Sequence, residues 1–239
     1  MKLLFIRHGD PDYSIDSLTE KGWKEAEYLA EKMAKINVDY YYVSPMGRAK
    51  DTASVTLKKL NRTATEYPWL KEFRVTDPKL MISGDACMWD RMPEEWTKEK
   101  QFFQPDQWYL PDIVKESGLK QEYDWVVTNF DALLEKYGYQ RDGAFYRVTN
   151  GNHDTLVFFC HFRVQCVLLS HLMNISPILL WHSLIAAPSS ITTVATEERE
   201  KGIASFRVNS FGDISHLYKQ GEPPSFAGRF REFYEDSEE

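Results

Sequence analysis

Cysteine is scarce in this chain, which holds three in 239 residues: Cys87, Cys160 and Cys166. The number is odd, and no pair has the spacing of a CxxC metal motif. This pattern argues against a scaffold of structural disulfides and against a zinc site. We therefore expect reduced thiols in a cytoplasmic protein, with Cys160 and Cys166 buried among their apolar neighbours.

Long hydrophobic runs and an excess of positive charge are also missing. The first apolar run ends at Arg7 and is too short for a signal peptide, and no stretch approaches the roughly 20 apolar residues of a membrane helix. The net charge of −7 repels polyanions. We therefore expect neither a membrane nor a nucleic-acid partner. A small anionic substrate is compatible with this charge, because a local basic pocket can outweigh a weak overall field.

The chain does contain an alternation of predicted strands and helices. Residues 2–6 and 155–160 are continuously apolar, which is typical of strands covered on both faces. Thr19 stands where a helix cap is expected, before an amphipathic segment. Helices are predicted over residues 18–36, 48–60, 118–137 and 163–173, and further strands over residues 38–44, 65–70, 144–149, 189–198 and 203–212. This alternation predicts a layered α/β sheet.

Residues 74–117 interrupt the alternation with a segment rich in aromatic side chains and poor in periodicity. We predict one domain over residues 1–239, with an insertion at 74–117 and an acidic tail at 229–239. The insertion is equally compatible with a lid and with a segment that simply packs against the rest of the domain.

The insertion is also where we expect substrate selectivity. Trp89 and Trp96 either stack on an apolar leaving group or pack the insertion onto the sheet. Several acidic residues make the segment unfavourable for highly phosphorylated substrates if it covers the site; they are Asp85, Asp90, Glu94 and Glu95.

Two of the buried strands end in histidine, at His8 and His161. Ligands of open α/β sheets bind beyond the carboxyl ends of the strands, so these histidines face one crevice if their strands are neighbours. Arg7 precedes His8, and the strand over residues 38–44 leads to Arg48. Two arginines and two histidines that converge form a pocket suited to a phosphoryl dianion. Each residue alone is more often structural, so the prediction depends on the combination.

The segment "LLFIRHGD", followed by "LTEKGWKEAE", resembles the opening of the histidine phosphatase superfamily, the phosphoglycerate-mutase-like enzymes. "SPMGRAKDTA" resembles the second motif of that family, "WLKEF" the third and "LVFFCHF" the fourth. The RHG tripeptide alone is a weak signal, but the four motifs in order are specific. The resemblance covers most of the chain apart from residues 74–117 and the tail.

This resemblance implies a three-layer α/β/α sandwich around a mostly parallel sheet, and a covalent mechanism in which His8 becomes phosphohistidine. It implies Arg7 and Arg48 as phosphate-binding residues. It also implies His161 as the second catalytic histidine and Glu72 as the proton donor. The residue types suit these roles, because neighbouring arginines favour a neutral imidazole and neutralise charge on the phosphoryl oxygens. No metal or other cofactor is implied.

The chain departs from the family pattern in two places. Many members have glycine after the second histidine, whereas this chain has Phe162 and then Arg163, which is a candidate to reach the substrate. Phe162 also excludes an aspartate that serves as the acid in a related branch, which favours Glu72. Glycolytic mutases carry tryptophan and asparagine after RHG; this chain has "DPDYSID", and Ser14 is a candidate to take over a phosphate hydrogen bond.

We predict a phosphatase acting on a small phosphorylated metabolite. One alternative is a phosphoglycerate-type mutase, which the missing mutase opening disfavours. The other is a protein that binds a phosphate ligand without catalysis. None of these patterns predicts an oligomeric state.

Overall fold

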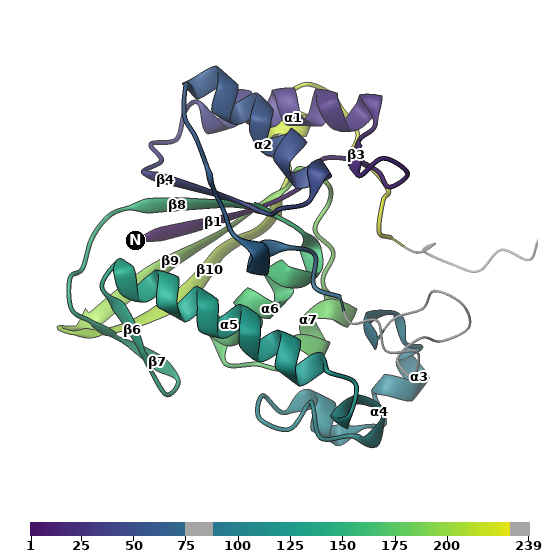
Figure 1. Ribbon diagram of the computed structural model, residues 1–239, viewed down its shortest axis with the longest axis vertical. Helices are drawn as coiled ribbons and strands as arrows, with labels where there is room; N and C mark the ends of the chain where they lie inside the picture. Colours follow the sequence, from purple (N-terminus) through teal and green to yellow (C-terminus); the bar gives the residue numbers. More distant parts are fainter. Residues whose placement is uncertain (75–87, 230–239) are drawn as a thin grey trace, which may run out of the picture.

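The computed structural model describes residues 1–74 and 88–229. Eight strands form one sheet in the order β5-β4-β8-β1-β9-β10-β7-β6, and helices cover both of its faces (Figure 1). The sheet contains β1 (Lys2–Arg7), β4 (Tyr40–Val43), β5 (Thr65–Glu66), β6 (Tyr139–Asp142), β7 (Phe145–Val148), β8 (Thr155–Cys160), β9 (Ile191–Glu200) and β10 (Ile203–Asp213). A short ribbon in the loop after β1 consists of β2 (Pro11–Asp12) and β3 (Ser17–Leu18).

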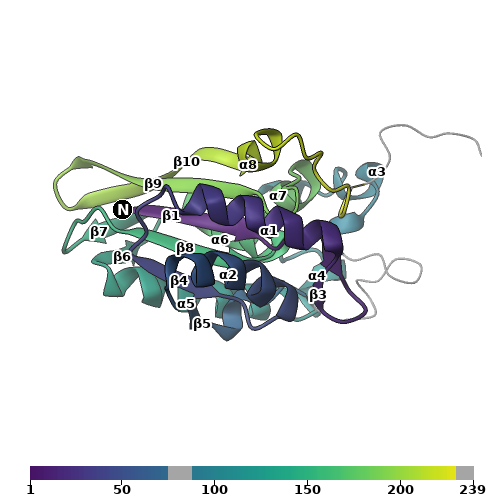
Figure 2. The ribbon, with the colours of Figure 1, turned by 90° about the horizontal axis from the view of Figure 1, so that it is seen from above.

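Long helices form the two outer layers (Figures 1 and 2). One layer holds α1 (Glu20–Met33) and α2 (Gly47–Leu60), with α8 (Ser215–Tyr218) against α1. The other holds α5 (Leu119–Lys136), α6 (Phe162–Met173) and α7 (Pro177–Ser183). The shorter helices are α3 (Pro93–Trp96), α4 (Asp112–Lys115) and 3₁₀ turns at Pro68–Leu70, Met88–Asp90 and Lys100–Phe103. The three-layer α/β/α arrangement predicted from the sequence is confirmed.

The half of the sheet that carries the two histidines is parallel. β1 pairs parallel with β8, β8 with β4, and β4 with β5. From β9 onward the pairings are antiparallel. The predicted parallel character therefore applies to β5, β4, β8 and β1, whose carboxyl ends lie at one edge.

Residues 3–6 of β1 are all apolar because both faces of the strand are covered. Leu3 and Phe5 belong to the core between the sheet and α5–α7. Leu4 and Ile6 belong to a second core beneath α1 and α2. A strand in this position needs continuous apolar residues rather than alternation.

Most predicted elements are confirmed within a few residues, and Thr19 caps α1 by accepting the N–H of Gly22 at 3.0 Å. The strand predicted over residues 65–70 is wrong beyond Glu66, because Pro68 has no N–H to pair and begins a 3₁₀ turn. β6 and α7 were not predicted, since both are short and lack a clear period.

The described part of the insertion, residues 88–117, is packed rather than extended. Trp96, Phe102 and Trp108 are buried and join the core beneath α5–α7. Whether the segment also opens as a lid stays a prediction. Residues 75–87, with Asp85 and Cys87, the side chain of Trp89, and residues 230–239 lie outside the described part.

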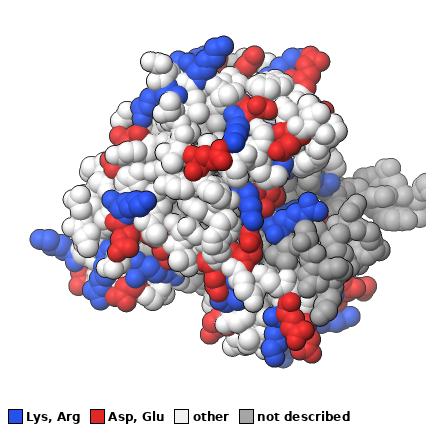
Figure 3. All heavy atoms as spheres, in the orientation of Figure 1, with Lys and Arg blue, Asp and Glu red and all other residues white. Residues whose placement is uncertain are grey.

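Positive and negative side chains are interspersed over the face shown in Figure 3. Within residues 1–74 and 88–229, no helix has the length and apolarity needed to cross a membrane. Cys160 and Cys166 are buried free thiols, as predicted.

Candidate active site

The neighbouring ends of β1 and β8 bring the two predicted histidines together. In the parallel register Arg7 lies opposite Cys160, so the next residues, His8 and His161, are side by side. Their ring centroids are 5.2 Å apart. Both rings are almost completely buried, at 1% and 0% exposure. Two segments more than 150 residues apart in sequence thus supply a pair of imidazoles at one sheet edge.

One hydrogen bond determines which nitrogen of His8 carries the proton. Its Nδ1 lies 2.7 Å from the carbonyl oxygen of Gly9, which can only accept, so Nδ1–H is the donor. Burial, then the charges of Arg7 and Arg48, lower the pKa of His8 well below its ordinary value, against the opposing effect of the Gly9 bond. The ring is therefore neutral at pH 7, and Nε2 holds a lone pair.

His161 is held through its other nitrogen. Its Nε2 lies 2.7 Å from the hydroxyl of Ser44, while its Nδ1 is buried with no partner among the described residues. Burial, followed by the neighbouring His8 and the arginines, lowers the pKa of His161 well below its ordinary value. Sequence reasoning missed Ser44, although it directly follows β4 just as the histidines follow their own strands.

The two predicted arginines are buried and only partly paired. Arg7 is 6% exposed and its Nη1 donates to the carbonyl of Ala186 at 2.5 Å; Arg48 is 5% exposed and its Nη1 donates to Oδ1 of Asp16 at 2.5 Å. The Nε–H of each guanidinium is buried without a partner among the described residues. An anion in this pocket would find donors that the chain itself does not use.

Asp16 organises the start of α2 and was not predicted. Besides pairing with Arg48, it accepts the N–H of Gly47 through Oδ2 at 2.7 Å. Met46, the cap residue, makes no side-chain cap of its own. A Cβ on Gly47 would stand 2.1 Å from the carbonyl oxygen of Asp16. The loop that carries Asp16 can therefore approach the start of α2 this closely only because residue 47 is glycine.

Gly9 allows a similar approach on the other side of the site. A Cβ there would lie 2.7 Å from the carbonyl oxygen of Gly22 in α1. The N–H of Gly9 donates to Oγ1 of Thr52 at 2.9 Å, which anchors the loop to α2. The glycine after the histidine is thus required by the contact with α1.

Glu72 lies at the amino end of α6. Its Oε1 accepts the N–H of Phe73 and the N–H of Arg163, both at 3.1 Å. His161 precedes α6 without a side-chain cap, so a carboxylate from a distant segment supplies one. Glu72 faces the same cavity as Arg7.

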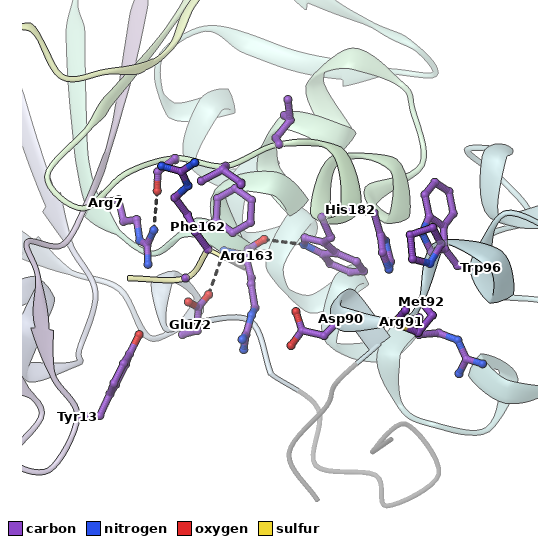
Figure 4. Close-up of a pocket in the computed structure, with 17 residues that line it drawn as sticks. Arg7, Tyr13, Glu72, Asp90, Arg91, Met92, Trp96, Phe162, Arg163 and His182 are labelled. Carbon is purple, nitrogen blue, oxygen red and sulfur yellow. Dashed lines mark hydrogen bonds between the residues drawn. The ribbon is translucent and has the colours of Figure 1, made fainter. Parts of the chain in front are cut away.

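A cavity of about 450 Å³ opens beside these groups (Figure 4). Arg7 and Glu72 line one end of it, and Trp96 and His182 the other. His8 and His161 do not line it themselves, but their sequence neighbours Arg7 and Phe162 do. The nucleophile candidate is therefore the sequence neighbour of a lining residue and not part of the lining itself.

Of the predicted site residues, Arg7 and Glu72 line this cavity, whereas His8, Arg48, His161 and Ser14 do not. Ser14 is exposed, and its hydroxyl donates to Oδ1 of Asp12 at 2.5 Å. Tyr13 lines the cavity from the same loop. A phosphate contact by Ser14 stays a prediction. Within residues 1–74 and 88–229, no three His, Cys, Asp or Glu side chains are grouped to hold a metal ion.

Comparison with known proteins finds similarity to one family over part of the chain. The model of the histidine phosphatase superfamily (branch 1) matches residues 3–116. A 2,3-bisphosphoglycerate-dependent phosphoglycerate mutase from Thermoplasma acidophilum is 30% identical over 104 residues, which are 39% of this chain and 47% of that protein. Phosphoserine phosphatase 1 from Hydrogenobacter thermophilus is 28% identical over 109 residues, 42% of this chain and 46% of that protein. The chain spans about half the length of the curated relatives it matches.

Solved structures share the fold over nearly the whole chain. A phosphoserine phosphatase from Entamoeba histolytica is 18% identical with a TM-score of 0.58, over 90% of this chain and 98% of that one. A mycobacterial glucosyl-3-phosphoglycerate phosphatase is 15% identical with a TM-score of 0.58, over 88% and 98%. At these identities the likeness establishes the fold alone.

Proposed function

Because residues 3–116 match the model of the histidine phosphatase superfamily, we propose that this chain hydrolyses phosphomonoesters of small metabolites through a phosphohistidine on His8. The observation that carries the proposal is the state of the His8 ring. Its Nδ1–H is engaged by Gly9 and its pKa is lowered by burial and by the arginines, which leaves a neutral ring with a lone pair on Nε2. This is the form of imidazole that attacks phosphorus.

In the first step, the Nε2 lone pair forms a bond to phosphorus while the bond from phosphorus to the ester oxygen breaks. The electron pair leaves with that oxygen, and Glu72 protonates it so that a neutral alcohol departs. A positioned acid of this kind is typically worth ~10²–10⁴ in rate. Arg7 and Arg48 bind the equatorial oxygens with donors that the chain leaves unused.

In the second step, water attacks phosphorus and the Glu72 carboxylate takes its proton. The bond from nitrogen to phosphorus breaks, its electron pair returns to Nε2 of His8, and inorganic phosphate leaves. His161 contributes a hydrogen bond in both steps. The Ser44 hydroxyl lies 2.7 Å from Nε2 of His161. In the tautomer that we propose, this hydroxyl donates to Nε2, and the proton on the otherwise unpartnered Nδ1 is donated to a phosphoryl oxygen.

A mutase is the second candidate, and one observation favours it. His8 is only 1% exposed, which keeps bulk water from a phosphohistidine. Incubation with 3-phosphoglycerate separates the two functions, because a phosphatase releases inorganic phosphate whereas a mutase forms the 2-phosphate isomer.

Hydrolysis of para-nitrophenyl phosphate with chelator present tests the proposal. We expect turnover by the wild type, no turnover by His8→Ala, and full turnover by His153→Ala, an exposed histidine that serves as the matched control. The wild type should also carry an acid-labile, alkali-stable phosphoryl group after rapid quenching. Activity that survives in His8→Ala would show that the nucleophile is another group. Phosphate binding without turnover of any ester would instead support the non-catalytic alternative.

A further inference from the structure

The cavity extends well beyond the reaction end. Arg7 and Glu72 stand at one end, and the lining continues past Phe162 to Trp96 and His182 at the other (Figure 4). Its volume of about 450 Å³ is in the range of sites for drug-sized ligands, about 300–1,000 Å³. A three-carbon phosphate bound at the reaction end would leave the far end filled with water.

The far wall is built from fixed flat rings. Trp96 stacks on His182 with centroids 4.7 Å apart and an angle of 29°. Nδ1 of His182 lies 2.8 Å from the carbonyl of Ile178, which holds the imidazole in place. Burial lowers the pKa of His182, so this imidazole is neutral at neutral pH. Met92, 60% exposed, lies at the edge of the same end.

The charges around the cavity balance a single phosphoryl group. Four guanidinium groups and two carboxylates line it among the described residues: Arg7, Arg91, Arg163 and Arg229 against Glu72 and Asp90. With Glu72 protonated as the acid of the first step, the surplus is three positive charges. Arg91 is paired with Glu95 at 3.3 Å, so about two positive charges remain, which match one phosphoryl dianion. A further acidic group on the substrate therefore has little positive charge left to meet it.

We propose that the substrate is a phosphomonoester whose leaving group is uncharged and bears a flat ring, which lies against Trp96 and His182 while the phosphoryl group meets Arg7. This inference rests on the proposed function and narrows its substrate class. The insertion, through Trp96, thus selects the leaving group, while the strand ends supply the chemistry. Trp96 also stacks on Phe103 with centroids 5.5 Å apart, so the substrate ring gains aromatic edge and apolar contact that a small aliphatic ester cannot make.

Three phosphate esters of alcohols test this selectivity. Each of them releases an alkoxide, so the type of leaving group is the same in all three. They are 2-naphthylmethyl phosphate, butyl phosphate and 3-phosphoglycerate. For the wild type we expect kcat/KM to be about tenfold higher for the naphthylmethyl ester than for the butyl ester, and lowest for 3-phosphoglycerate. Trp96→Ala should lower the first value about tenfold and leave the second within about twofold.

Trp96→Phe keeps an aromatic ring at the wall and should retain most of the preference for the naphthylmethyl ester. Met92→Ala should reduce that preference, and Met92 is too exposed for its loss to threaten folding. Trp23→Ala, on the distant α1 and 38% exposed, is the control that should change neither value. Equal kcat/KM for the naphthylmethyl and butyl esters in the wild type would overturn this inference and leave the proposed function intact. A parallel loss for both esters in Trp96→Ala would do the same. Failure to hydrolyse any phosphomonoester would overturn both this inference and the proposed function.

Discussion

The Oε1 atom of Glu72 accepts the backbone N–H of Arg163 at 3.1 Å, so the carboxylate proposed as the proton donor also caps α6. The N–H of Phe73 donates to the same oxygen at 3.1 Å. These two backbone amides hold one oxygen of the Glu72 carboxyl group, which faces the cavity. The orientation of Glu72 is thus fixed by the backbone of α6, which follows His161, and by the backbone of the adjacent residue Phe73.

Glu72→Gln should separate orientation from proton transfer. Glutamine keeps a carbonyl oxygen for the two amides but gives no carboxylic proton, so we expect kcat for an alkyl phosphate to fall ~10²–10³-fold. The nitrophenolate leaving group needs little protonation, so hydrolysis of para-nitrophenyl phosphate should fall less. Steady-state kinetics on both esters measures the difference, and Glu66→Gln on β5 is the surface control. An equal loss on both esters would mean that Glu72 acts through structure alone.

The pH profile should report the lowered pKa of His8. Because burial and the arginines favour its neutral form, the acid limb of kcat/KM should lie below the ordinary histidine pKa of about 6.5. Arg48→Gln removes one of these positive charges, so the limb of the residual activity should move upward toward pH 6.5. Lys50→Gln, exposed on the same helix, should leave the limb in place. A limb that does not move in Arg48→Gln would show that another group titrates.

Glu25 should make the protein less stable as the pH rises from about 4.5 to about 7. Burial raises the pKa of this carboxyl from 4.5 to about 7, with Asp10 adding to the shift, while the N–H of Asp10 and the charge of Lys21 oppose it. The folded state therefore binds a proton that the unfolded state releases, and the free energy of unfolding should fall by about 3 kcal/mol over this window.

Glu25→Gln should flatten that dependence, because glutamine can still accept the Asp10 N–H bond of 2.8 Å without ionising. Urea unfolding at pH 5 and pH 8 measures it, with the exposed Glu27→Gln as the matched control. If both variants keep the wild-type slope, Glu25 is ionised throughout.

Gly22→Ala should disturb the loop that carries the nucleophile. A Cβ at this position would lie 2.2 Å from the carbonyl oxygen of Asp10, and backbone cannot yield as a side chain can. We expect a loss of about 1–3 kcal/mol in the free energy of unfolding, together with a lower kcat. In Gly151→Ala the nearest atom is a side-chain oxygen of Glu198 at 3.3 Å, so this variant should be close to neutral. Equal stability of the two variants would contradict the contact.

Much of the fold was predictable, because its signals are local. Continuous apolar runs marked β1 and β8, and helical periodicity marked α1 and α5. The turn at Pro68 and the short α7 escaped this reasoning, since a few residues carry no period. In the site, the residues that follow the strands could be named in advance. Asp16 and Ser44 could not, because their importance depends on which segment each one meets.

The sequence by itself determined that two buried strands end in His8 and His161, that arginines accompany them, and that four motifs stand in family order. Each of these features is encoded by a short stretch of consecutive residues. Only the tertiary structure decided the protonation and alignment of the site. Ser44 meets His161 across 117 residues, Glu72 meets Arg163 across 91, and Asp16 meets Arg48 across 32. Burial and proximity create the neutral imidazoles and the unused donors of the site, and both arise only when distant segments exclude water together.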